Sequence, residues 1–308
     1  MMEYESLKSD LRGVAFTNPT PFSEDGGDVL HDELADQVES LREAGARLVI
    51  PCGNTGEYYS LSNDERAAVV ETTADVMGGE GSVVAGLGGS LPTARGLLSR
   101  YEDAGADAVM VMHPVHTYIH RDGLRRYYEE LIDATHLGVI LYKRGDELDD
   151  DLIADLAGEE NVVAVKYAVN DVKAFSKAVA TTEADVVWSN GIAERFAPAF
   201  AVEGAEGFTT GVGNFAPEPA LALMDALRAE DYERAREIRE RFRPYEDLRE
   251  EPGAESHLSA ANNVPAVKFG MELAGRYGGP VRPPLVDLSD EDEERAREYY
   301  DHLVSGEY

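Results

Sequence analysis

Cysteine is almost absent from this chain, since Cys52 is the only one among 308 residues. No intramolecular disulfide can form, and nothing points to an oxidising compartment. A run of 18 apolar residues is also missing, and the first residues form neither a basic leader nor an apolar core. These absences predict a soluble, cytoplasmic protein that does not associate with a membrane.

Basic residues are scarce relative to acidic ones. The chain has 28 Lys and Arg against 60 Asp and Glu, a formal net charge of −32. Nucleic acid is therefore excluded as an expected partner, because both molecules would be polyanions. Acidic runs at 149–151, 250–251 and 290–294 predict a solvated acidic coat, and no loop has the ligand spacing of a calcium site. Because salt screens such a coat, we expect a halophilic protein in a high-salt cytoplasm.

Short apolar runs alternate with amphipathic stretches along most of the chain. Strands are expected at 13–17, 47–52, 82–87, 108–112, 137–142, 162–166, 185–188 and 206–210. A helical stretch follows each run, and strands that alternate with helices form parallel sheets through right-handed crossovers. Eight such units predict an α/β fold, a closed (β/α)8 TIM barrel.

The pattern changes to helices alone beyond Pro217. Helices are expected at 220–229, 232–242, 264–275 and 291–303. We therefore predict a barrel over residues 1–229 and a C-terminal helical extension over 230–308, packed together as one structural unit. The long polar stretch 244–263 is predicted to be a mobile or interface loop.

One apolar run ends in a lysine. Residues 162–165 are Val-Val-Ala-Val, typical of a strand buried on both faces, and Lys166 follows directly. Burial disfavours the ammonium form, so this amine could become neutral and attack a ketone to form a Schiff base. Taken alone, the residues favour a simpler alternative in which the lysine reaches solvent at the strand end, because buried lysines are rare.

Other chemically useful residues end neighbouring strands, where the active sites of such barrels lie. Tyr142 ends the strand before Lys166, and its phenol could transfer protons if both side chains point inward, although tyrosines at strand ends usually only pack. Gly53-Asn54-Thr55-Gly56 follows the second strand. Its glycines permit a tight turn whose N–H groups suit a carboxylate, although such turns are common.

The order of 53–57, Tyr142, Lys166 and 207–214 resembles the dihydrodipicolinate synthase and N-acetylneuraminate lyase superfamily, and the resemblance extends from residue 13 to 268. It implies an imine between Lys166 and pyruvate or another 2-oxo acid, no cofactor or metal, and a homo-oligomer, usually a tetramer. For Tyr142 it implies a proton-relay role.

The resemblance also implies a substrate pocket. Asn54 and Thr55 would bind the carboxylate of the 2-oxo acid, largely through backbone N–H groups, while the Asn190-Gly191 turn and Thr209 would line the same pocket.

The chain departs from dihydrodipicolinate synthases at several positions. Asn54 stands where these enzymes usually have a threonine, and Glu147 where they have a carboxylate-binding arginine. The segment 142–144, Tyr-Lys-Arg, is more similar to the keto-deoxy-glucarate dehydratase branch. Arg144 would then hold a distal carboxylate or hydroxyl, or alternatively pair with Asp146 or Glu147 at the rim.

Three histidines, His113, His116 and His120, occur within eight residues after the fourth strand, where the synthases carry a second tyrosine. Such a cluster suggests a metal site. A metal and an imine-forming lysine are alternative ways to activate a carbonyl, so we expect no metal. His116 is instead expected to take the place of that tyrosine as a proton-relay or specificity residue.

These observations predict a lyase or aldolase that acts on pyruvate or a related 2-oxo acid through Lys166. A 2-keto-3-deoxy sugar acid dehydratase that uses the same imine is an alternative. A catalytically silent barrel with a binding role is another, because one fold hosts many functions.

Overall fold

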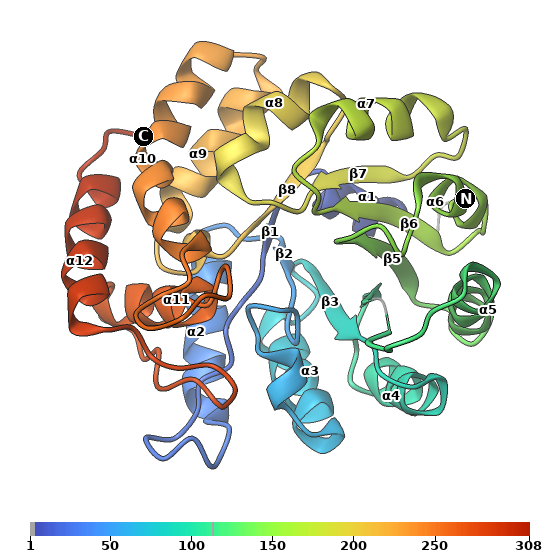
Figure 1. Cartoon of the computed structure of the whole chain (residues 1–308), viewed down its shortest axis with the longest axis horizontal. Helices are drawn as coiled ribbons and strands as arrows, with labels where there is room; N and C mark the ends of the chain where they lie inside the picture. The colour runs from blue at the N-terminus through green and yellow to red at the C-terminus, as the bar shows by residue number, and fades with distance from the viewer. Residues whose placement is uncertain (1–3, 113) are drawn as a thin grey trace.

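The structure, a computed structural model, describes residues 4–112 and 114–308. Eight parallel strands form a closed barrel in sequence order (Figure 1). The strands are β1 (Val14–Phe16), β2 (Leu48–Val49), β3 (Ser82–Leu87), β4 (Ala108–Val111), β5 (Gly138–Lys143), β6 (Val162–Tyr167), β7 (Val187–Asn190) and β8 (Gly207–Thr210). Every strand residue is buried, as expected for parallel strands covered by helices. The predicted (β/α)8 barrel is confirmed.

Helices surround the barrel and continue beyond it. They are α1 (Glu5–Leu11), α2 (His31–Glu43), α3 (Asn63–Met77), α4 (Leu91–Asp103), α5 (Arg121–Ile132), α6 (Asp150–Leu156), α7 (Val172–Thr181), α8 (Ala197–Val202), α9 (Pro217–Arg228), α10 (Tyr232–Glu250), α11 (Asn263–Leu273) and α12 (Asp290–Val304). Short 3₁₀ turns are η1 (Tyr58–Ser60), η2 (Glu194–Phe196) and η3 (Val212–Asn214). In several helices a serine or aspartate side chain caps the first turn, for example Ser62 in α3 and Asp149 in α6.

The helix α1 lies where the sequence suggested only a short polar leader. Its two apolar residues, Leu7 and Leu11, are one helical turn apart and both buried. A Cβ at Gly138, the first residue of β5, would come within 2.5 Å of Leu7. The Lys8 Nζ lies 3.0 Å from an Asp185 carboxylate oxygen just before β7. This helix therefore covers the N-terminal end of the barrel, opposite the strand ends that carry the candidate residues.

The prediction that a helix ends at residue 242 and a polar loop starts at 244 is wrong. Helix α10 continues through Pro244 to Glu250. A proline inside a helix costs about 3 kcal/mol, because it removes one backbone hydrogen bond and crowds the preceding turn. Tyr245 and Leu248, just beyond the proline, have no exposed surface. Burying two such side chains contributes about 1.5–3 kcal/mol each, which offsets the proline.

The extension shares an apolar core with the barrel. In one cluster, Phe16 of β1 and Phe208 of β8 lie together with Tyr245 of α10, Met271 of α11 and Leu303 of α12. Figure 1 shows α10, α11 and α12, in orange to red, side by side against one flank of the barrel. The C-terminal helices are therefore packed close enough to contribute to the barrel mouth.

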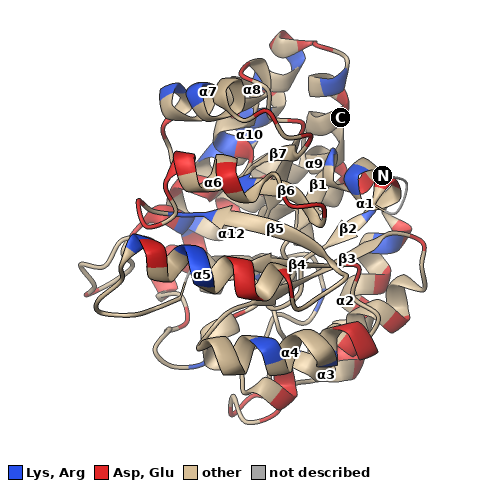
Figure 2. Ribbon diagram, turned by 90° about the vertical axis from the view of Figure 1, so that its right-hand side faces the viewer, with Lys and Arg blue, Asp and Glu red and all other residues tan. Residues whose placement is uncertain are grey.

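Charged residues occupy the periphery. Figure 2 shows acidic residues along the outer helices and loops, while the strands are almost free of charge. Within the described part of the chain, none of the helices has the length and apolar character needed to cross a bilayer.

Candidate active site

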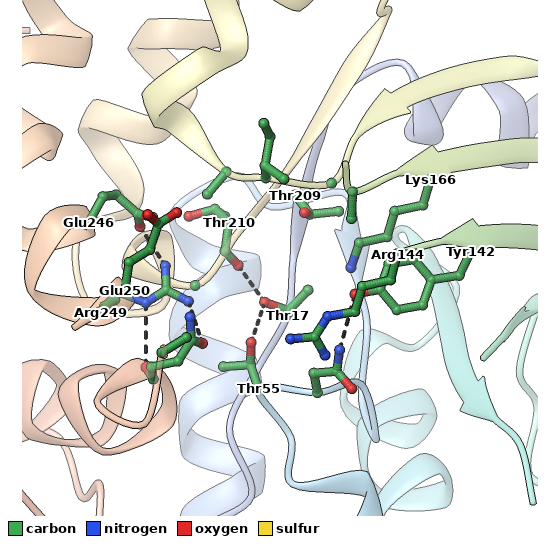
Figure 3. A pocket seen from close by; sticks show the side chains of 18 of the residues that line it. Thr17, Thr55, Tyr142, Arg144, Lys166, Thr209, Thr210, Glu246, Arg249 and Glu250 are labelled. Atoms are coloured by element: carbon green, nitrogen blue, oxygen red, sulfur yellow. Dashed lines mark hydrogen bonds and ion pairs between the residues drawn. The ribbon is translucent and has the colours of Figure 1, made fainter. Parts of the chain in front are cut away.

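A cavity of about 370 Å³ lies at the carboxyl ends of the strands. Six of the residues predicted from sequence line it together: Asn54, Thr55, Tyr142, Arg144, Lys166 and Thr209. They come from β5, β6, β8, the residue after β5 and the turn after β2, so the barrel topology brings them together from distant parts of the chain. Figure 3 shows the Lys166 and Tyr142 side chains next to each other on one side of this cavity.

Lys166 is buried on β6, with 7% of its surface exposed. It is paired in register with Tyr142 of β5, and its Nζ lies 4.5 Å from the centroid of the Tyr142 ring. Burial lowers the pKa of Lys166 to about 7, and the positive charge of Arg144 acts in the same direction. A large fraction of this amine is therefore neutral at physiological pH.

Tyr142 is fixed by a side chain from the glycine turn. The Asn54 Nδ2 donates a hydrogen bond of 3.0 Å to the Tyr142 hydroxyl oxygen. The phenol accepts in this bond, so its own hydrogen remains available to a molecule in the cavity. Burial raises the pKa of Tyr142, while Arg144 and the Asn54 hydrogen bond oppose that shift. Tyr142 is therefore a neutral proton donor at neutral pH.

Hydroxyl groups connect the turn to two neighbouring strands. The hydroxyls of Thr55 and Thr17 form a hydrogen bond of 3.1 Å, and the Thr17 hydroxyl also bonds the Thr210 carbonyl at 2.7 Å (Figure 3). Thr17 follows β1 and Thr210 ends β8. The side chain of Thr55 is thereby connected, through Thr17, to the end of β8.

Arg144 lies just after β5 and lines the same cavity. Its charge lowers the pKa of Lys166 and opposes the rise in the pKa of Tyr142. Within residues 4–112 and 114–308, Arg144 forms no salt bridge, so the alternative pairing with Asp146 or Glu147 is not observed. Its guanidinium is therefore available to an anionic group in the cavity.

The opposite wall comes from α10 and was not predicted. Glu246, Arg249 and Glu250 line the cavity across from Lys166 (Figure 3). The Arg249 Nη1 lies 2.5 Å from the Glu246 carboxylate, and its Nη2 donates to the Asn263 side chain at 3.0 Å. Only the continuation of the helix past Pro244 places positions 246, 249 and 250 on one face. These residues were not predicted, because the helix was expected to end at residue 242.

A buried acid lies behind this wall. Glu194 in η2 has no exposed surface, and its carboxylate accepts a hydrogen bond from the Thr210 hydroxyl. Burial raises the pKa of Glu194 to about 8, and the negative charge of Glu246 acts in the same direction. Glu194 is thus mainly protonated at neutral pH. Sequence interpretation missed it as well, because nothing in the surrounding pattern predicts burial.

Two predicted site residues are not among those that line the cavity. The Asn190 side chain donates to the Ala193 carbonyl at 2.8 Å and accepts from the Ile192 N–H at 3.0 Å, so it shapes its own turn. The neighbouring Gly191 lines the cavity in its place.

His116 is exposed, accepts a hydrogen bond from the Tyr118 N–H, and borders a separate pocket beside α5. It is not among the residues that line the cavity at the strand ends. His113 lies outside the described residues. Among the residues that are described, no three His, Cys, Asp or Glu side chains are arranged to hold a metal ion.

The chain was compared with protein families and with known proteins. The model of the dihydrodipicolinate synthetase family matches residues 10–302. The 4-hydroxy-tetrahydrodipicolinate synthase of Methanopyrus kandleri is 32% identical over 293 residues, 93% of this chain and 94% of that protein. A probable 5-dehydro-4-deoxyglucarate dehydratase of Variovorax paradoxus is 29% identical over 312 residues, 98% of this chain and 99% of that protein.

Among solved structures, the dihydrodipicolinate synthase from Oceanobacillus iheyensis matches with a TM-score of 0.92 and 33% identity, and the match covers 98% of this chain and 100% of that one. The resemblance inferred from sequence is thus confirmed. This chain belongs to the dihydrodipicolinate synthetase family and is an enzyme of the lyase type.

Proposed function

We propose that this enzyme forms a Schiff base between Lys166 and the ketone of pyruvate or a related 2-oxo acid. One observation carries the proposal: a buried lysine whose pKa is lowered to about 7 lines a cavity, 4.5 Å from the ring of Tyr142. A neutral amine is the nucleophile that attacks a ketone. A catalytically silent barrel has no use for this arrangement.

The remaining lining residues supply binding and proton transfer. Asn54 and Thr55 hold the carboxylate of the 2-oxo acid, and Thr209 lines the adjacent wall. Tyr142 protonates the hydroxyl that leaves as water when the imine forms. The protonated imine then accepts electrons as a proton leaves C3, and the resulting enamine adds to an aldehyde. In reverse, a carbon–carbon bond breaks and pyruvate is released. No step requires a metal or a cofactor.

A dehydratase is the second candidate, favoured by Arg144. This cation lines the cavity, has no salt bridge to any described residue, and could bind the distal carboxylate of a sugar diacid. Relatives named 5-dehydro-4-deoxyglucarate dehydratase support this candidate. From the same imine, loss of a C3 proton and of the neighbouring hydroxyl would release water. A panel of 2-keto-3-deoxy acids, assayed for pyruvate and for dehydrated product, distinguishes the two.

Reductive trapping tests the imine that both candidates share. The protein is incubated with pyruvate and borohydride in concentrated salt, digested, and analysed by mass spectrometry. We expect one reduced pyruvate adduct on the peptide that contains Lys166. An unmodified Lys166, alongside a control aldolase that is labelled, would overturn the proposal.

The rate of adduct formation should depend on pH with a midpoint near 7. Only the neutral amine attacks, so the rate at low pyruvate rises with pH and levels off above the lowered pKa of Lys166, about 7. Arg144→Met removes a positive charge that disfavours the ammonium, so its midpoint lies at higher pH. Stopped-flow rates across this range give both midpoints. A parent midpoint near the ordinary lysine value of about 10.4 would contradict a buried amine.

We also infer the setting in which the enzyme works. The net charge of −32 favours a high-salt cytoplasm, where screening relieves repulsion. We expect a dimer or tetramer, supported by large exposed apolar side chains after β4, where Val115 is 75% exposed and Tyr118 85%. The shared apolar cluster supports the barrel and the extension acting as one structural unit.

A further inference from the structure

The turn that presents Asn54 and Thr55 ends in a buried carboxylate, Glu57. The backbone of Glu57 has φ +54°, a left-handed conformation that is uncommon outside glycine. Its side chain has no exposed surface. Strained residues of this kind persist only where the surrounding structure determines them, so contacts around Glu57 must hold it in place.

Both oxygens of that carboxylate are bound by the C-terminal part of the chain. The Lys268 Nζ of α11 lies 2.6 Å from Oε1, and the backbone N–H of Arg282 donates to Oε2 at 2.9 Å. Lys268 is 2% exposed and also donates to the Pro280 carbonyl at 2.6 Å. The ion pair is therefore dry, and removing either partner leaves an uncompensated buried charge.

An aromatic ring lies close to both cations of this cluster. The Lys268 Nζ is 4.3 Å and the Arg282 Cζ 4.0 Å from the centroid of Phe22, which has no exposed surface. The Arg282 guanidinium also donates to the Gly26 and Ser60 carbonyls, so it joins segments that follow β1 and β2. The pair is thus part of a fixed junction between the extension and the barrel mouth.

Backbone contacts connect this junction to the cavity. The Glu57 N–H donates to the Asn54 carbonyl at 3.1 Å, which closes the turn. A Cβ at Gly56 would lie 3.0 Å from the Cys52 nitrogen, so the turn packs closely against the backbone of Cys52. Asn54 in turn bonds Tyr142. The backbone of Glu57 is therefore connected, through Asn54, to the Tyr142 hydroxyl in the cavity.

We propose that Glu57, through its ion pair with Lys268, is a positioning residue for the carboxylate-binding turn, so that the C-terminal extension controls affinity for the 2-oxo acid. This inference rests on the proposed function of the turn. Glu57 does not line the cavity, and acts only through Asn54 and Thr55.

The test separates positioning from folding with Glu57→Gln, Lys268→Met and the double variant. The thermal unfolding midpoint and the pyruvate concentration that gives half-maximal borohydride trapping are measured for each. We expect both single variants to have a lower unfolding midpoint than the parent, because each leaves one buried charge unpaired. The double variant should have a midpoint close to that of the parent, because no unpaired charge remains. Half-saturation by pyruvate should stay about 10- to 100-fold higher in the double variant, since a turn shifted by about 1 Å binds poorly.

Lys8→Met is the matched control, because it removes a lysine ion pair at the opposite end of the barrel. It should lower the unfolding midpoint only slightly, because Asp185 is exposed, and leave half-saturation unchanged. A double variant whose half-saturating pyruvate concentration equals that of the parent would overturn the inference.

Titration calorimetry of pyruvate without borohydride separates the two proposals. A parent that binds pyruvate but is never trapped overturns the Schiff base alone, and the variants still decide the role of Glu57. A parent that does not bind overturns both.

Discussion

We expect Lys166→Arg to abolish trapping of pyruvate and to lower turnover by about 10⁴-fold or more, the scale seen when a covalent nucleophile is removed. Arginine keeps a positive charge in the cavity but stays protonated and forms no useful imine. Mass spectrometry of the borohydride-treated variant, with steady-state assays in concentrated salt, measures both effects.

Lys143→Arg is the matched control for that experiment. Lys143 is the last residue of β5 and, like Lys166, is buried. Its Nζ donates to the Leu148 carbonyl at 2.8 Å and lies 3.3 Å from Asp150, away from the cavity. Arginine preserves the ion pair, so trapping should persist. Equal labelling of the Lys166→Arg variant and its parent would refute Lys166 as the nucleophile.

We expect Tyr142→Phe to slow imine formation by about 10²- to 10⁴-fold, the usual contribution of a positioned proton donor. The ring that packs against Lys166 remains, so pyruvate affinity changes little while the rate at saturation falls. Single-turnover trapping at saturating pyruvate measures this rate.

Tyr101→Phe provides the comparison for Tyr142→Phe. The Tyr101 hydroxyl donates to the Gly86 carbonyl at 3.0 Å in the core, so its loss should cost about 1 kcal/mol of stability without slowing the reaction. A Tyr142→Phe enzyme as fast as this variant would remove the phenol from the mechanism.

The barrel was predictable because its strands are short apolar runs between amphipathic stretches. Two other elements of the fold could not be predicted from the sequence. Helix α1 contains only Leu7 and Leu11 as buried apolar residues, too few to signal a helix in a polar leader. Pro244 favoured a helix end, whereas the burial of Tyr245 and Leu248 stabilises the continuation of α10 to Glu250. Both errors arise where contacts with distant residues outweigh local preference.

The candidate site was predictable where it depends on strand ends. Lys166 and Tyr142 end apolar runs, so their place at the ends of neighbouring strands could be inferred from the sequence, whereas their register could not. Arg249 and Glu194 could not, because one depends on the continuation of α10 and the other on burial against β8. His116 was predicted to belong to the site but borders a separate pocket. Its position after the fourth strand in sequence does not determine where a loop side chain lies.

The cavity wall contributed by α10 comes from a different part of the chain than the buried amine and phenol. The amine and the phenol belong to β5 and β6, whereas Glu246, Arg249 and Glu250 lie many residues downstream. Exchanging the segment around 244–263 between relatives would therefore change one wall of the cavity while leaving Lys166 and Tyr142 in place. Chimeric enzymes built at this junction offer a direct route to altered substrate range, and the same division allows a lineage to diversify without rebuilding its reactive centre.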